Sequence, residues 1–138
     1  MSRAGWRLVL ATLGAVVIGL GYVAWFDPSG RTSRPAPRPM TVPELSAEAR
    51  AGRQAFDTHC APCHGEHAMG GPTGPPLVDP IYRPAHHADI AFALAVRRGV
   101  RAHHWRLGDM PPQPSISETD VRNITRYVRE LQQANGIE

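Results

Sequence analysis

The sequence contains no lysine, because all 15 of its basic residues are arginine. The 12 acidic residues leave a formal net charge of only +3, and the chain has no dense basic run. This balance is too mild to indicate a protein that binds the phosphates of nucleic acids. Cysteine is also scarce: Cys60 and Cys63 are the two copies, so no disulfide framework is available. Any chemistry of cysteine thiols is therefore confined to one place in the chain.

A long apolar run lies near the N-terminus. Residues 8–26 carry no charge, which is enough for a helix that spans roughly 30 Å of hydrocarbon. Two arginines precede the run and an aspartate follows it, so the positive-inside rule predicts a single-pass anchor in the inner (cytoplasmic) membrane, with the remainder facing the periplasm. A cleaved signal peptide is the competing interpretation, although Ala24 sits in a poor cleavage site. We expect residues 1–26 to be a signal anchor.

Residues 27–43 form the next segment. They contain five prolines and three arginines with little apolar surface, which is typical of a semi-extended tether. The folded domain should then occupy residues 44–138. In that range ten arginines face eleven acidic residues, so the domain is nearly neutral.

Three segments of this domain have the periodicity of helices. The first follows Ser46, which can cap it, and its apolar stripe contains Leu45, Ala49, Gly52 and Phe56. The second covers residues 89–98 and ends at Gly99. The third follows Ser117 and places one apolar face at Val121, Ile124, Val128 and Leu131. Residues 65–84 and 100–116 are rich in glycine and proline and should be loops. No segment alternates like a strand, so the domain is predicted to be all-α.

The two cysteines belong to the segment Cys60-Ala61-Pro62-Cys63-His64. The spacing C-x-x-C-H is the signature of covalent haem attachment, in which both thiols add to vinyl groups and the next imidazole becomes an axial ligand. A thioredoxin-like pair would need a βαβ context. A zinc site would need a second ligand cluster with cysteines that the sequence lacks. The motif therefore predicts one haem c, attached through Cys60 and Cys63 and ligated by His64.

The second axial ligand of the iron has several candidates. Met1 begins the chain, Met40 lies in the tether, and Met69 is too close to His64 to reach the opposite face easily. Met110 remains, in a loop stiffened by Pro111 and Pro112. A thioether there would raise the reduction potential and leave no open position at the iron. Ordinary core filling is the other role for Met110, and the rival ligands are His86, His87, His103 and His104.

Three parts of the domain together resemble class I cytochromes c. They are the segment Gly52-x-x-x-Phe56-x-x-x-Cys60-Ala61-Pro62-Cys63-His64, the Met110-Pro111-Pro112 loop, and the closing helix with Tyr127-Val128-Arg129-x-Leu131-Gln132. The resemblance covers residues 44–138 and implies three main helices around one covalent haem, with the first and last helices crossing. Gly52 would permit their close approach near Tyr127. Gly74-Pro75 followed by Leu77 resembles the element whose proline carbonyl accepts a hydrogen bond from the proximal histidine, here His64.

The chain departs from the best-known family members in lacking their ring of docking lysines. Arg97, Arg98, Arg101 and Arg106 are candidates to replace it. Trp105 and Arg106 are also candidates to bind the haem propionates, which are anions that need partners when buried. A solvent-exposed arginine face and a core tryptophan are the alternatives.

We interpret the chain as a membrane-anchored monohaem electron-transfer protein and not as an enzyme. Its order of anchor, tether and cytochrome domain is similar to that of membrane-bound cytochromes c, which pass electrons from a quinol-oxidising complex to a terminal oxidase. One alternative is a cytochrome subunit that serves as the electron outlet of a periplasmic dehydrogenase. Another is a haem enzyme or gas sensor with an open iron position.

Overall fold

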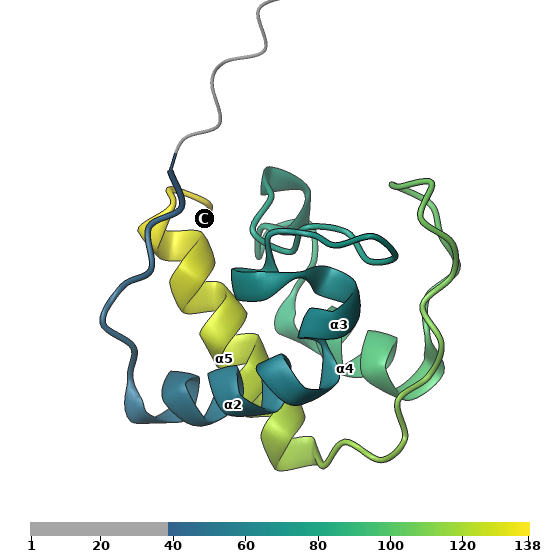
Figure 1. The fold of residues 1–138 in the computed structure, drawn as a ribbon, viewed down its shortest axis with the longest axis horizontal. Coiled ribbons are helices and arrows are strands. Elements are labelled where there is room, and N and C mark those ends of the chain that lie inside the picture. Colours follow the sequence, from purple (N-terminus) through teal and green to yellow (C-terminus); the bar gives the residue numbers. More distant parts are fainter. Residues whose placement is uncertain (1–38) are drawn as a thin grey trace, which may run out of the picture. The chain divides into compact units, whose positions relative to one another are not determined.

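The computed structural model describes residues 39–138, which form a helical domain (Figure 1). The helices are α2 (Ala47–His59), α3 (Ala61–His64), α4 (Asp89–Arg98) and α5 (Glu118–Ala134). Two short 3-10 helices, η1 (Glu66–Ala68) and η2 (Pro80–Tyr82), interrupt the first long loop. Within these hundred residues, the sole β-type pairing is an isolated bridge between Val100 and Met110. The predicted all-α class is confirmed.

The predicted membrane anchor, residues 1–26, lies outside the described part of the chain. Among the helices of residues 39–138, none has both the length and the apolar character needed to cross a bilayer. The compact unit that the structure describes runs from Pro39 to Glu138. Thr41 exchanges two hydrogen bonds of 2.9 Å with the side-chain amide of Asn135. The last residues of the proline-rich segment therefore pack on the domain.

Helices α2 and α5 cross at Gly52 and form the most extensive contact between helices (Figure 1). A β-carbon at Gly52 would lie 1.9 Å from the carbonyl oxygen of Asn123, so a larger residue cannot fit. The close approach is therefore near Tyr127, as predicted, and lies one helical turn before it. Tyr127 packs edge-on against Phe56, with 5.6 Å between ring centroids. Both rings are fully buried, and burying one such side chain stabilises the fold by about 1.5–3 kcal/mol.

Both predicted helix caps are present. The Ser46 hydroxyl accepts a hydrogen bond from the Ala49 amide at 3.2 Å, and the Ser117 hydroxyl accepts one from the Asp120 amide at 3.1 Å. The four apolar positions expected on the last helix are all buried. Helix α4 has the predicted bounds and ends at Gly99, but it buries only Val96. Ile90 and Leu94 are exposed, whereas Phe92 and Ala93 are partly buried against the core.

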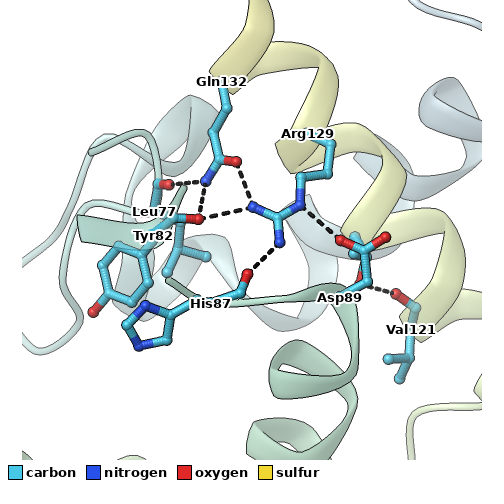
Figure 2. A network of polar contacts seen from close by, with 8 residues as sticks. Leu77, Tyr82, His87, Asp89, Val121, Arg129 and Gln132 are labelled. Carbon is cyan, nitrogen blue, oxygen red and sulfur yellow. Dashed lines mark hydrogen bonds and ion pairs between the residues drawn. The ribbon is translucent and has the colours of Figure 1, made fainter. Parts of the chain in front are cut away.

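Arg129 and Gln132, on α5, bind the backbone of the segment that precedes α4 (Figure 2). The Arg129 guanidinium donates to the carbonyl oxygens of Tyr82, at 2.8 Å, and His87. It also donates to the Asp89 carboxylate at 2.8 Å. The Gln132 amide donates to the carbonyl oxygens of Leu77 and Tyr82, at 2.8 and 3.1 Å. Part-buried carbonyls need such partners, so these two side chains attach residues 77–89 to the helical core.

Candidate functional site

Cys60 lies at the junction of α2 and α3. Its amide donates to the Phe56 carbonyl and its carbonyl accepts from the His64 amide, both at 2.8 Å, so a single helical turn holds the motif. Cys60 is half-buried against the core and Cys63 is exposed, and both are free of disulfides. Burial raises the pKa of the Cys60 thiol to about 11, and Cys63 contributes to the rise. Because neither cysteine is in a disulfide, both sulfur atoms are available for covalent attachment.

His64 is held in place by Pro75. The His64 Nδ1 atom lies 2.9 Å from the Pro75 carbonyl oxygen, and because a carbonyl only accepts, Nδ1 must carry the hydrogen. The free lone pair is then on Nε2, as metal ligation requires. Burial lowers the pKa of His64, while the hydrogen bond to Pro75 partly offsets this by raising it. The imidazole is therefore neutral at neutral pH and fixed in one tautomer.

The loop that carries Pro75 packs directly on the backbone of the motif. The Gly70 amide donates to the His64 carbonyl at 2.7 Å. A β-carbon at Gly74 would lie 2.8 Å from the carbonyl carbon of Cys63, and one at Gly71 would lie 2.3 Å from the Cys63 oxygen. Glycine at these positions lets the loop approach closely enough to bring the Pro75 carbonyl to His64.

A largely apolar cavity of about 420 Å³ lies beside this loop. Its size falls within the range of about 300–1,000 Å³ that is typical of cofactor pockets. Four of the predicted site residues line it together: Pro75, Leu77, Trp105 and Met110. Cys60, Cys63 and His64 are not among the lining residues, and His64 is joined to the wall through Pro75. Arg106 is exposed and outside the lining, whereas Arg98 forms part of it.

Met110 is fixed by its pairing with Val100. The two residues exchange backbone hydrogen bonds, both of 2.9 Å. Gly99 brings α4 close to this bridge, since a β-carbon there would lie 2.4 Å from the Met110 oxygen. The Met110 side chain is half-buried, packs on the core and lines the cavity. Met110 is thereby held at the cavity wall by a backbone with little freedom.

Trp105 carries an unsatisfied polar atom. Its indole Nε1 is buried and has no hydrogen-bond partner among the described residues. The Trp105 side chain lies near Tyr82. Burial raises the pKa of Tyr82 and the nearby Trp105 offsets part of this rise, but no hydrogen bond joins the two side chains. A buried N–H without an acceptor costs about 1–3 kcal/mol, so an acceptor on a bound group would stabilise this side chain. The haem propionates that the resemblance implies are such acceptors, and the residues therefore fit that cofactor.

Sequence reasoning did not identify the supports of the cavity wall. Tyr82 lines the cavity, and its carbonyl is held by Arg129 and Gln132. Arg129 and Gln132 lie within the closing-helix motif, but nothing local indicates partners that are 42 to 55 residues away. The four histidines of unassigned role gather at this wall, and three of them line the cavity: His87, His103 and His104.

The chain matches one protein family and two curated relatives. The profile of the family described as Cytochrome c matches residues 49–132. A Cbb3-type cytochrome c oxidase subunit CcoP from Rhodobacter capsulatus is 33% identical over 92 residues, which cover 64% of this chain and 31% of the relative. A second CcoP sequence from Rhodobacter capsulatus is 32% identical over 94 residues, with the same coverage of 64% and 31%. The chain thus spans about a third of the length of these relatives. No solved structure gives a significant match.

Proposed function

The chain belongs to the cytochrome c family, and on that premise we propose that it carries single electrons with one haem c held through Cys60 and Cys63. When bound, haem supplies an iron that accepts and releases one electron. The observation that carries the proposal is the attachment motif joined to an oriented imidazole. The Pro75 carbonyl oxygen accepts a hydrogen bond from the His64 Nδ1 atom at 2.9 Å, which would leave Nε2 free to bind the iron.

We assign His64 and Met110 as the two axial ligands. A thioether opposite an imidazole raises the reduction potential and fills the last position at the iron. The bridge between Val100 and Met110 supports the assignment, because it keeps the backbone of the second ligand in one place. Little rearrangement would then accompany the gain or loss of an electron.

The pocket residues supply the remaining contacts of the proposed site. Pro75 and Leu77 contribute apolar wall, which keeps water away from the ring. Trp105 has a buried N–H to donate to a propionate. Two arginines are the proposed cationic partners: Arg98, which lines the cavity, and Arg106, which is exposed. They would pair with the haem propionates and with acidic groups on redox proteins.

We further propose that the acceptor of the electrons is a terminal oxidase complex. The two relatives are named as subunits of cbb3-type cytochrome c oxidase, which supports an oxidase partner here. In this proposal a quinol-oxidising complex is the donor, residues 8–26 anchor the chain in the inner membrane, and the domain faces the periplasm. Co-purification of the full chain with oxidase subunits is expected. Co-purification with a periplasmic dehydrogenase would favour the alternative role of electron outlet for that enzyme.

Carbon monoxide distinguishes the electron carrier from a haem enzyme or gas sensor. The full chain should be produced in a host that matures c-type cytochromes and then be reduced and exposed to the gas. With His64 and Met110 both bound, the optical spectrum should not change at neutral pH. Ready binding of carbon monoxide would mean an open iron position and would contradict the proposed function. Cys63→Ala should lower the yield of covalently attached haem in the same host.

A further inference from the structure

Four histidines from two separate loops meet at one place on the surface. His86 and His87 precede α4, and His103 and His104 lie in the loop before Met110. The ring centroids of His86 and His87 are 4.7 Å apart, those of His87 and His104 are 5.4 Å apart, and those of His103 and His104 are 4.1 Å apart. The electron-transfer proposal uses none of these rings.

Three of the rings present nitrogen atoms that converge. One ligand atom from each of His86, His87 and His104 lies within 4.8 Å of the other two. In a tetrahedral site with metal–nitrogen distances of about 2.0–2.1 Å, ligand atoms are roughly 3.4 Å apart. Two of the rings, His86 and His104, are exposed, so side-chain rotation can supply the small closure that a metal needs. Imidazole nitrogens with this spacing suit zinc and copper ions.

His87 is already oriented as a metal ligand. Its Nδ1 atom lies 2.8 Å from the carbonyl oxygen of Ile81, so Nδ1 carries the hydrogen and Nε2 carries the free lone pair. A carbonyl in this role fixes the tautomer and the ring orientation of metal-binding histidines. His103 has the same arrangement, with Nδ1 2.8 Å from the Arg101 carbonyl, and its ring centroid lies 4.1 Å from that of His104.

The backbone beneath the cluster is also held. The amides of His86 and His87 both donate to the Arg83 carbonyl, at 2.9 and 2.8 Å. The His87 carbonyl accepts from Arg129 on α5 (Figure 2). On the other loop, the Ala102 amide donates to the Asp109 carboxylate at 2.8 Å. These contacts order the backbone of the site before the metal binds, so metal binding would require less loss of conformational entropy.

We propose that His86, His87 and His104 form a binding site for a divalent transition-metal ion of the zinc and copper class. His103 or water would complete the coordination. None of the three residues belongs to the haem attachment motif, although His87 and His104 also line the cavity, and the existence of the site does not depend on the proposed electron-transfer function. A metal bound there would link the residues that precede α4 to the loop that carries Trp105. It would thereby join two segments of the cavity wall.

Zinc binding to the haem-loaded full chain tests the proposal. After treatment with a chelator and its removal, titration calorimetry with zinc sulfate should give one zinc ion per wild-type chain. The double variant His86→Ala/His104→Ala should bind zinc at least about 100-fold more weakly, because it retains one of three ligands. His59→Ala, which removes an exposed histidine outside the cluster, should keep the wild-type affinity. An unchanged haem spectrum in each variant shows that the domain is intact.

A second measurement requires no variant. X-ray absorption at the zinc edge of the wild-type complex should show nitrogen ligands at about 2.0–2.1 Å with the scattering pattern of three or four imidazoles. The proposal is overturned if the wild-type chain binds no zinc, if the double variant binds it as tightly as wild type, or if the absorption spectrum lacks imidazole ligands. Ligation of the haem iron by His87, His103 or His104, seen in the haem spectrum, would also overturn it, because it would break up the cluster.

Discussion

The Nδ1 atom of His64 donates a hydrogen bond of 2.9 Å to the carbonyl oxygen of Pro75. This contact connects the attachment motif to the cavity wall, since Pro75 lines the cavity while His64 does not. It also sets the tautomer of the ring and would increase the basicity of Nε2 as a ligand to the iron. The acceptor is a backbone atom, so the contact depends on where the loop lies and not on the proline side chain.

Gly74→Ala should weaken this contact. The new β-carbon would lie 2.8 Å from the backbone of Cys63, so the loop must move outward and carry the Pro75 carbonyl away from His64. We expect a loss of about 1–3 kcal/mol in the free energy of unfolding, as for other overpacked sites, together with a lower affinity of the imidazole for iron. Denaturant unfolding of the haem-loaded protein measures the first effect. Thr73→Ala, at an exposed neighbour, should change stability little. Equal stability of the two variants would contradict the proposed role of the loop.

Met110→Ala should open the iron and lower the reduction potential. Axial ligands set haem potentials over a range of about 0.8 V, and we expect a fall on the order of 100 mV. The variant should also bind carbon monoxide when reduced. The matched control is Met69→Ala, because Met69 is 46% exposed and lies outside the cavity lining. If both variants keep the wild-type potential, Met110 is not a ligand.

Arg129→Ala should destabilise the cavity wall. It leaves the carbonyl oxygens of Tyr82 and His87 without their guanidinium donor, at a cost of about 2–3 kcal/mol in the free energy of unfolding. Arg126→Ala, on the same helix, removes an arginine that is 61% exposed and pairs with Glu130. The Glu130 side chain of this pair is only 14% exposed, but Arg126 itself lies at the surface, so we expect the loss of this arginine to cost less than about 1 kcal/mol. Denaturant unfolding measures the loss of unfolding free energy in both variants. A similar loss in each would contradict the claim that the buried contacts of Arg129 stabilise the cavity wall.

Glu130 should make the stability depend on pH. Burial raises the pKa of its carboxyl, but hydrogen bonds from Ser46 and the Arg126 guanidinium outweigh this and lower it from the ordinary value of 4.5. A carboxyl whose pKa is lower in the folded state stabilises the fold above pH 4.5 and loses that contribution as the pH falls further. Glu130→Gln should therefore cost about 1 kcal/mol at neutral pH. Unfolding curves at several pH values should show the cost disappearing in acid, whereas a cost independent of pH would contradict the assignment.

Local patterns predicted the parts of the fold that local chemistry determines. Ser46 and Ser117 cap the helices that follow them, and the apolar face of α5 is buried as its periodicity indicates. The His64–Pro75 hydrogen bond followed from a family resemblance and is present. In each case the information lies within about one helical turn or within a recognised motif.

Contacts between distant residues were beyond such patterns. The residue that Gly52 contacts on the last helix, Asn123, depends on how two whole helices pack. Arg129 and Gln132 look like ordinary polar positions of an amphipathic helix, yet their partners are backbone carbonyls that carry no sequence signal. The gathering of His86, His87 and His104 likewise depends on how two loops lie beside each other.

A spectroelectrochemical titration of the full wild-type chain, purified from a host that matures c-type cytochromes, tests the central claim most directly. We predict a haem spectrum that survives denaturation, because the cofactor is bonded to Cys60 and Cys63, and one reversible transition that follows a one-electron Nernst curve. A colourless protein, a haem that separates on denaturation, or the absence of a reversible one-electron transition would contradict the account.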